Sequence, residues 1–410
     1  MEEIPGEFVN LDINQNNTLS NETMSLENYT EDISSEFGYC KTYLKPFEKY
    51  YSTIHGYNSL IICLFGAQAN ILNLIILTSK QMRTPTNLIL TGLAVADLAN
   101  MLEYIPFAIH RILPRNNSYE WALYVFIHSN FSQVCHTTSI WLAVTLAIWR
   151  YVMVTRYNES KTLCSMKRAK CAVLAAYLFS GVLCTPIYFS FAVKSVESFR
   201  NGTALSLDQT TESPLNNTRT QYVVNMSDLA LKYPFLKTAN FWLYSVVIKI
   251  IPCAIFTVVS CRLMNSLTDV KIHKGMLFPM RKIHAETRLS AHRDECSSKE
   301  LTQPRATRTS CSFDSSSGSD LTNRMLLAIL FLFLITEFPQ GLLGLMSGIM
   351  GDSFFNNCYN PLGDLMDFVA LLNSAINFIL YCTMSEKFRE TFMKVFSLGR
   401  VIRRCPFCKE

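Results

Sequence analysis

The run YNSLIICLFGAQANILNLIIL, Tyr57 to Leu77, carries no charged side chain from end to end. A helix of about 20 apolar residues crosses the ~30 Å hydrocarbon core of a bilayer, whereas runs of about 10 to 14 usually belong to the cores of water-soluble proteins. The composition of the whole chain agrees with membrane residence, because 49% of its residues are hydrophobic and only 17% are charged. This run therefore predicts a membrane-spanning helix.

Six further runs have the length and composition of a membrane span. Trp121–Trp149 and Cys171–Val193 contain no Asp, Glu, Lys or Arg, and the other four contain one or two such residues within apolar sequence. We expect an all-α membrane protein, a seven-transmembrane helix bundle within residues 55–385. The seven predicted spans cover about residues 55–79, 86–110, 121–155, 169–193, 239–264, 322–350 and 361–384.

The distribution of charge predicts which side of the membrane each loop faces, because Lys and Arg concentrate in cytoplasmic loops. Basic residues follow the first, third, fifth and seventh spans, whereas residues 1–40 hold nine acidic residues and no Lys or Arg. The N-terminal arm, residues 1–54, is therefore predicted to lie outside a multi-pass protein of the plasma membrane. Glycosylation sequons fall on the same outer side, at Asn16, Asn21, Asn28, Asn116, Asn201, Asn216 and Asn225.

Two polar segments between the spans are predicted to be long solvated loops, because they are too polar to bury a core. The outer one, about residues 194–237, is rich in Asn, Thr and Ser. The inner one, about residues 266–321, is basic and then Ser-rich, and we expect it to be disordered.

The segment after the last span has its own pattern. Phe388, Phe392 and Phe396 recur every four residues among basic ones, which predicts an amphipathic helix over 386–397 that lies in the membrane interface. The tail that follows, residues 398–410, is predicted to be cytoplasmic. Two cysteines in it are candidates for reversible palmitoylation, Cys405 and Cys408.

Motifs along the spans resemble the rhodopsin-like (class A) G-protein-coupled receptors, and the likeness covers about Ser59 to Phe396. The segments TNLILTGLAVADL (86–98), TLAIWRYVMV (145–154) and NSAINFILY (373–381) resemble the second, third and seventh spans of that family. The resemblance implies a sodium ion near Asp97 and an activation switch that couples to a G protein. The residues that it assigns to the switch are Asp97, Trp149, Arg150, Tyr151, Pro339, Asn377 and Tyr381.

The chain departs from the common pattern of that family at several switch positions. Trp149 replaces the acid that usually precedes the arginine, so Arg150 lacks its adjacent carboxylate partner. Phe378 replaces the proline of the last motif, and Glu337 replaces the tryptophan of span six. Glu337 thus places a carboxylate at one of the family's switch positions.

The disulfide that most members of the family form between span three and the second outer loop cannot form in this chain. Val125 stands about where the span-three cysteine belongs, and residues 191–252 contain no cysteine. Outside the predicted spans on the outer side only Cys40 and Cys358 remain, and an oxidising exterior favours their pairing. We expect this bridge to tie the N-terminal arm to span seven.

The combination of WRY, TEFPQG and MRTPTNLILTGLAVADL resembles the invertebrate branch that includes myosuppressin and sex-peptide receptors. This resemblance implies a receptor for a short extracellular amidated peptide of the FMRFamide type. The partners that it implies inside the cell are a heterotrimeric G protein, with Gi/o favoured, and arrestin. The sequence has no Gly-rich phosphate loop and no metal-ligand cluster that would indicate an enzyme, and no cofactor is expected beyond the sodium ion.

Two charges of opposite sign inside the predicted spans are candidates for a buried ion pair. Lys249 lies three residues before Pro252 and Glu337 two before Pro339, and spans five and six are neighbours in such receptors. A charge in the middle of a membrane helix costs roughly 2.5–3.5 kcal/mol and normally has a partner inside the bundle. The pair either fixes the packing of the two spans or forms a switch whose partners change when a ligand binds, and the sequence leaves both readings open.

Polar residues of the spans are candidates for contacts with an amidated peptide. A ligand that ends in Arg-Phe needs an anion for its guanidinium and an aromatic surface for its ring. Asp367 is the best-placed carboxylate, with Asp364 behind it, and Ser132, His136 and Ser139 share one face of span three. The predicted ligand-binding residues are Asp367, Glu337, His136, Lys249, Glu103, Gln340 and Trp242.

A secondary transporter also carries charges near the middle of the membrane, so Asp97, Lys249 and Glu337 could form an ion relay. Transporters usually show internal repeats, and the sequence shows none. A retinal photoreceptor is excluded, because span seven offers no lysine for a Schiff base. An ion-coupled carrier stays the alternative to a receptor.

Overall fold

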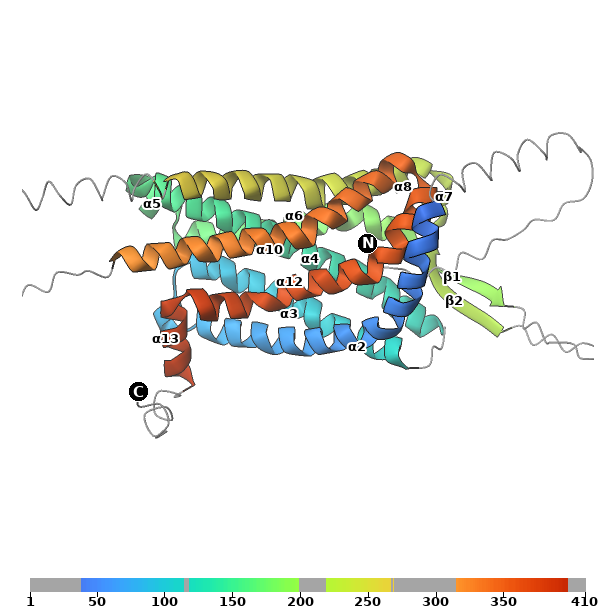
Figure 1. Ribbon diagram of the computed structural model, residues 1–410, viewed down its shortest axis with the longest axis horizontal. Coiled ribbons are helices and arrows are strands. Elements are labelled where there is room, and N and C mark those ends of the chain that lie inside the picture. Colours follow the sequence, from blue (N-terminus) through green and yellow to red (C-terminus); the bar gives the residue numbers. More distant parts are fainter. Residues whose placement is uncertain (1–37, 114–117, 199–218, 267, 269–314, 397–410) are drawn as a thin grey trace, which may run out of the picture.

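The computed structural model describes residues 38–113, 118–198, 219–266, 268 and 315–396. Long helices run side by side in one bundle (Figure 1), and seven of them are long and apolar enough to cross a membrane. The seven-helix fold that the sequence predicts is confirmed. The first four of these helices are α2 (Gly38–Leu77), α3 (Pro85–Ile112), α4 (Tyr119–Thr155) and α6 (Met166–Ser190).

The last three candidate spans are less regular than the first four. The fifth, Pro234–Ser266, contains α8 (Pro234–Trp242) and the π-helical η2 (Leu243–Ile250), and the sixth lies in α10 (Ser315–Met350). The seventh joins α11 (Asp352–Phe354), η3 (Phe355–Tyr359), η4 (Asn360–Leu362) and α12 (Gly363–Met384). Four short helices complete the helical part that the structure describes, η1 (Lys80–Met82), α5 (Tyr157–Leu163), α7 (Asp228–Lys232) and α13 (Glu386–Val395).

Hydroxyl side chains fix the starts of several helices. Thr84 Oγ1 accepts a hydrogen bond from the Asn87 N–H at 3.2 Å where α3 begins. At the start of α4, Ser118 Oγ accepts one from the Trp121 N–H at 3.3 Å. Such caps satisfy backbone donors that the first helical turn leaves unpaired, so these helices begin where the sequence places a capping residue.

Helix α2 begins well before the predicted first span, because Gly38–Ile54 is helical rather than part of an irregular arm. Hydropathy gave no signal for these outer turns, since they are rich in charged and polar side chains. A disulfide anchors them, because Cys40 is bonded to Cys358 of η3 with the two Cα atoms 5.2 Å apart. The end of α2 that the sequence predicts to be the outer one is thereby held against the start of the seventh span.

A β-hairpin corrects the prediction of a solvated outer loop. Strand β1 (Phe191–Ser198) pairs antiparallel with β2 (Arg219–Met226), with Phe191 opposite Met226 and Ser198 opposite Arg219. Helix α6 therefore ends at Ser190 and does not reach residue 193. The polar composition concealed these strands, because their backbone groups pair with each other and only one side packs on the bundle, through Val224 in a cluster with Met101 and Val125.

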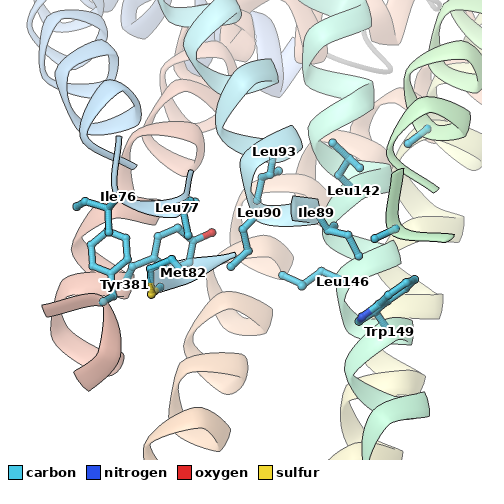
Figure 2. Packing of buried hydrophobic residues seen from close by; sticks show 13 residues of the cluster. Ile76, Leu77, Met82, Ile89, Leu90, Leu93, Leu142, Leu146, Trp149 and Tyr381 are labelled. Atoms are coloured by element: carbon cyan, nitrogen blue, oxygen red, sulfur yellow. The ribbon is translucent and has the colours of Figure 1, made fainter. Parts of the chain in front are cut away.

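The half of the bundle that the sequence predicts to be the inner one is held by one cluster of buried apolar side chains. Figure 2 shows it as a row that runs from Tyr381 of α12, past Leu77, Met82 and Leu90, to Trp149 of α4. Trp149, only 9% exposed, packs here with Ala169 and Ala176 of α6. The position that usually holds an acid beside the arginine is thus used for packing between α4 and α6.

Helix α13 leaves the inner end of the bundle across the direction of the spans (Figure 1). Its phenylalanine face is not simply immersed in the membrane interface as the sequence suggested, because Phe388 is 1% exposed and packs against Phe378 and Tyr381. Phe396, at the far end, is 39% exposed. The start of the helix is therefore part of the protein core, and only its end presents an aromatic ring outward.

Close approach of α10 to the fifth span needs glycine at position 341. A Cβ atom built on Gly341 would lie 2.8 Å from Lys249 Cβ and 3.3 Å from Ile250 Cγ1. We expect Gly341→Ala to destabilise the solubilised protein by about 1–3 kcal/mol, as overpacking does, and to lower its melting temperature. Gly181→Ala in α6 is the matched control, because a Cβ there meets nothing within 4 Å and should leave stability unchanged or improve it slightly. Equal melting temperatures for the two variants would contradict this account of the packing.

Candidate ligand site

Three polar side chains from three spans meet in the centre of the bundle. Lys249 Nζ lies 2.5 Å from Glu337 Oε2 and 2.7 Å from His136 Nε2, and His136 Nε2 lies 3.1 Å from the same Glu337 oxygen. Lys249 and Glu337 are both 0% exposed. The pair expected between spans five and six is therefore present, and α4 adds a histidine to it.

The histidine can bond to either charged partner. An ammonium group can only donate, so Lys249 donates to Glu337 Oε2. The Nε2 atom of His136 lies within hydrogen-bond distance of both Lys249 Nζ and Glu337 Oε2, and its tautomer decides whether it accepts from the first or donates to the second. Its Nδ1 has no hydrogen-bond partner within the part of the chain that the structure describes.

Glu337 also reaches a fourth helix. Asn373 Nδ2 of α12 donates to Glu337 Oε1 at 3.4 Å, so the carboxylate joins α10 to α4, η2 and α12. The π-helical turn that carries Lys249 was not expected from the sequence. Such irregular turns are frequent at functional sites, and here Lys249 lies within one, between Leu243 and Ile250.

A small cavity adjoins this cluster at His136. Its volume is about 30 Å³, which is room for one or two water molecules. Side chains of five helical elements line it: Asn100 and Tyr104 of α3, Ser132, Gln133 and His136 of α4, Tyr244 of η2, Gln340 of α10, and Asp367, Ala370 and Leu371 of α12. The cavity therefore lies where most of the spans converge.

Two of the lining side chains have polar atoms left without a partner. Asp367 is 9% exposed, and no hydrogen bond or salt bridge from a described residue reaches its carboxylate. Gln340 is 4% exposed, and its carbonyl oxygen Oε1 is buried without a donor in the described part of the chain. Buried polar groups are normally hydrogen-bonded, so both side chains are available to a ligand or to water.

The structure brings together most of the predicted ligand-binding residues and leaves two apart. Asp367, His136 and Gln340 line the cavity, and Lys249 and Glu337 adjoin it through His136. The Glu103 carboxylate instead contacts His128 Nδ1, and the side chain of Trp242 is 44% exposed on the outside of the bundle.

Sequence reasoning missed part of the lining. Asn100 and Gln133 are carboxamides buried in two of the spans, and Ser132 Oγ donates to Asn100 Oδ1 at 2.6 Å. The signal that could have found them is the same one that marked Glu337, a polar side chain within apolar sequence. An amide carries no charge, so the sequence marks these two residues less strongly than the carboxylate of Glu337.

Asp364 has a different role from the one suggested for it behind Asp367. Arg111 Nη2 of α3 lies 2.5 Å from Asp364 Oδ2 and 3.0 Å from Ser52 Oγ of α2. His55 of α2 is 3.7 Å from the other Asp364 oxygen. Asp364 is thus engaged in holding the outer ends of three helices together, and Asp367 is left as the carboxylate of the cavity.

The residues assigned to the switch lie farther toward the inner end. Asp97, 1% exposed, accepts hydrogen bonds from Ser139 Oγ at 2.8 Å and from Asn377 Nδ2 at 2.9 Å. Arg150 forms no salt bridge with any acidic residue that the structure describes. The structure therefore joins Asp97 to Asn377 and leaves the Arg150 guanidinium without a carboxylate.

Most of the predicted modification sites fall outside the described residues. Asn225 is exposed on β2. The other sequons and the tail cysteines lie outside, namely Asn16, Asn21, Asn28, Asn116, Asn201, Asn216, Cys405 and Cys408.

Comparison with known proteins places these features in a family. The chain matches the family described as "Serpentine type 7TM GPCR chemoreceptor Srw" over residues 57–289 and 299–399. It is 30% identical over 366 residues to "G-protein coupled receptor dmsr-1" of Caenorhabditis elegans, an alignment that covers 87% of this chain and 70% of that protein. Two proteins of Drosophila melanogaster are also similar, the sex peptide receptor at 24% identity (87% of this chain, 75% of that one) and the FMRFamide receptor at 22% (84% and 54%).

Proposed function

The chain belongs to the serpentine seven-transmembrane G-protein-coupled receptors of the Srw family, and from this membership we propose that it is the receptor of a short amidated peptide. The peptide is of the FMRFamide or myosuppressin type, and the receptor signals through Gi/o proteins. Two of the similar proteins are a sex peptide receptor and an FMRFamide receptor, and these relatives support a peptide ligand. In a receptor the intramembrane charges would serve ligand binding and activation. The ion-coupled carrier, which the sequence left open as an alternative, is then not needed to explain them.

The observation that carries the proposal is the carboxylate of Asp367, which no hydrogen bond or salt bridge from a described residue reaches. A carboxylate in a largely buried position is unfavourable unless a charged or hydrogen-bonding partner reaches it. The guanidinium of an arginine in the ligand would supply both, as two parallel N–H···O hydrogen bonds of the kind that arginine forms with carboxylates. Asp364 cannot take this role while Arg111 occupies it.

The ring that follows this arginine would lie among the apolar lining side chains. Tyr104, Tyr244 and Leu371 offer aromatic and aliphatic surface beside Asp367. A volume of about 30 Å³ holds no aromatic ring, so the peptide must bind a wider conformation of the cavity than this one. A ligand that binds the wider conformation better shifts the population of receptors toward that conformation. Binding and conformational change are therefore coupled.

Widening of the cavity would act directly on the central cluster. Gln340 and Glu337 are three residues apart on α10, so they share one helix face, and His136 belongs to both the cavity and the cluster. We assign to Glu337 a change of partner on binding, after which α10 swings about Pro339. The inner ends of the spans then expose Arg150 and Tyr151 to a G protein or to arrestin, with Tyr381 and Asn377 moving on α12.

Asp97 fits the sodium ion that the family resemblance implies. Its carboxylate is buried, and no Lys, Arg or His of the described residues forms a salt bridge with it. A sodium ion prefers oxygen ligands, and the carboxylate of Asp97 and the hydroxyl of Ser139 would supply them. The ion would neutralise this buried carboxylate, which no basic side chain among the described residues does.

The proposal is tested by the response of transfected cells to a panel of amidated peptides. We expect peptides that end in Arg-Phe-amide to activate a Gi/o reporter at low concentration, and cells without the receptor to stay silent. Coupling to another G protein would leave the ligand class standing and overturn only the Gi/o assignment. Uptake of a labelled solute without any G-protein response would favour a carrier.

Asp367→Asn is expected to weaken the potency of such a peptide roughly 10- to 150-fold, because a hydrogen bond to a charged group contributes about 1.5–3 kcal/mol. Dose–response curves at matched surface expression measure the effect. A peptide with citrulline in place of arginine should lose potency on the unmodified receptor and little more on the variant. Asp352→Asn is the matched control, because this exposed acid pairs with Lys237 outside the cavity and its loss should leave potency unchanged. An unaltered response of Asp367→Asn would place the arginine contact elsewhere.

A further inference from the structure

The cavity has a composition that distinguishes between two forms of a peptide's C-terminus. Its lining carries one carboxylate, that of Asp367, one imidazole and three carboxamides, those of Asn100, Gln133 and Gln340. Among the described side chains that line it there is no lysine or arginine, and the nearby Lys249 is engaged with Glu337 and His136. A site that recognised a free carboxylate would be expected to offer a cation, and the described lining offers none.

The three carboxamides are not equivalent. Asn100 Oδ1 accepts a hydrogen bond from Ser132, and Gln133 Nε2 donates to Thr137 Oγ1 at 3.2 Å. Gln340 Oε1 is different, because it is a buried acceptor with no donor in the described part of the chain. An unpaired buried acceptor costs about 1–3 kcal/mol, so a ligand that brings a donor to this oxygen is favoured.

A terminal carboxamide and a terminal carboxylate interact with this oxygen in opposite ways. The carboxamide has two N–H donors and is neutral, whereas the carboxylate has only acceptors and a negative charge. A carboxylate at Gln340 would face another acceptor and would lie in the same cavity as the Asp367 anion. Its desolvation would be uncompensated, and a site that leaves polar groups unpaired against the wrong ligand discriminates strongly.

We propose that Gln340 Oε1 accepts a hydrogen bond from the C-terminal carboxamide of the ligand, and that this contact makes the receptor specific for amidated peptides. The assignment rests on the proposed function, since it concerns the same cavity and names the residue that reads the amide. Gln340 lies one helical turn from Glu337 on α10. Recognition of the amide therefore takes place on the helix that carries the switch carboxylate.

The test uses Phe-Met-Arg-Phe-amide, its free acid and its methyl ester on three receptors brought to equal surface expression. The ester is neutral and has no terminal N–H donor, so the ratio of ester to amide potency isolates the donor from the charge. On the unmodified receptor we expect the amide to be at least 10-fold more potent than the ester and at least 100-fold more potent than the acid. On Gln340→Leu, which keeps the size of the side chain but removes the acceptor, the ratio of ester to amide potency should rise to about one.

Gln133→Leu is the matched control. This carboxamide also lines the cavity, but its Nε2 donates to Thr137 Oγ1, and its Oε1 is not among the buried acceptors that lack a donor in the described part of the chain, so the ratio of ester to amide potency should stay at the unmodified value. If Gln340→Leu lowers the potency of amide and ester equally, the ratio of ester to amide potency stays at the unmodified value. That result would overturn the assignment to Gln340, provided that the unmodified receptor responds to the amide. Absence of any response of the unmodified receptor to the amide would instead overturn the proposed ligand class, and the assignment with it.

Discussion

Loss of either charge of the Lys249–Glu337 pair alone is expected to reduce surface expression sharply, whereas loss of both together is expected to restore it. Each single change, Glu337→Leu or Lys249→Met, leaves an uncompensated charge at a position that is 0% exposed. Removing one partner of a buried ion pair costs about 3–5 kcal/mol, while replacing both by apolar residues of similar volume is often neutral. Surface labelling of the single and double variants measures the difference.

The double variant Lys249→Met/Glu337→Leu then separates the two roles that the sequence left open. If the pair only fixes the packing of spans five and six, the double variant should signal like the unmodified receptor. We expect a different result, namely raised basal signalling per receptor and a diminished response to peptide, because α10 has lost its links to His136, Lys249 and Asn373. Normal basal and evoked signalling would leave the pair with a packing role alone.

An exposed pair between the outer ends of the same part of the bundle provides the control. Lys237 of α8 pairs with Asp352 of α11, and their side chains are 28% and 65% exposed. Exposed ion pairs contribute about 0–1 kcal/mol. Lys237→Met and Asp352→Leu, alone or together, should therefore change neither expression nor basal signalling, and a loss as large as that of Glu337→Leu would indicate a general intolerance of these substitutions.

The double change Cys40→Ser/Cys358→Ser is expected to have an effect of similar size. The two cysteines are 318 residues apart in the sequence, and loss of loop closure over that length corresponds to roughly 5–6 kcal/mol in the chain-entropy treatment of disulfides. We expect low surface expression and a lower melting temperature of the solubilised receptor. Non-reducing and reducing peptide maps of the unmodified protein should differ at these two cysteines.

Cys171→Ser is the matched control for this variant, because Cys171 is an exposed free thiol of α6. It should behave like the unmodified receptor. A peptide map that finds Cys40 and Cys358 as free thiols, or a double variant as stable as Cys171→Ser, would contradict the assigned bridge.

The spans and the central pair were predictable because each depends on a strong local signal. An apolar run such as Tyr57–Leu77 has few alternatives to a membrane helix, and Glu337 within apolar sequence demands a partner of opposite sign. The participation of His136 was less evident, since a histidine on one face of a span says nothing about the rotation of its neighbours. Its place in the cluster is set by how α4, η2 and α10 pack.

Other features depend on contacts between segments that are remote in the sequence. Arg111 lies near the end of α3 and Asp364 near the start of α12, and only the assembled bundle brings them to 2.5 Å. The hairpin was concealed for a related reason, because β1 and β2 are stabilised by pairing with each other across an intervening stretch of chain. The π-helical η2 has no marker in its residues, because its sequence LYSVVIKI contains no glycine or proline and no side chain caps its start.

The Cys40–Cys358 bond gives the receptor the topology of a closed ring with two tails. The ring contains the first six spans and is closed at η3, at the start of the seventh span, so the first and seventh spans leave the closure as neighbours. A single broken peptide bond anywhere between the two cysteines would open the ring without dividing the molecule. The loops on both sides of the membrane can therefore be cut once, in any of six connections, and all seven spans stay covalently attached to one another.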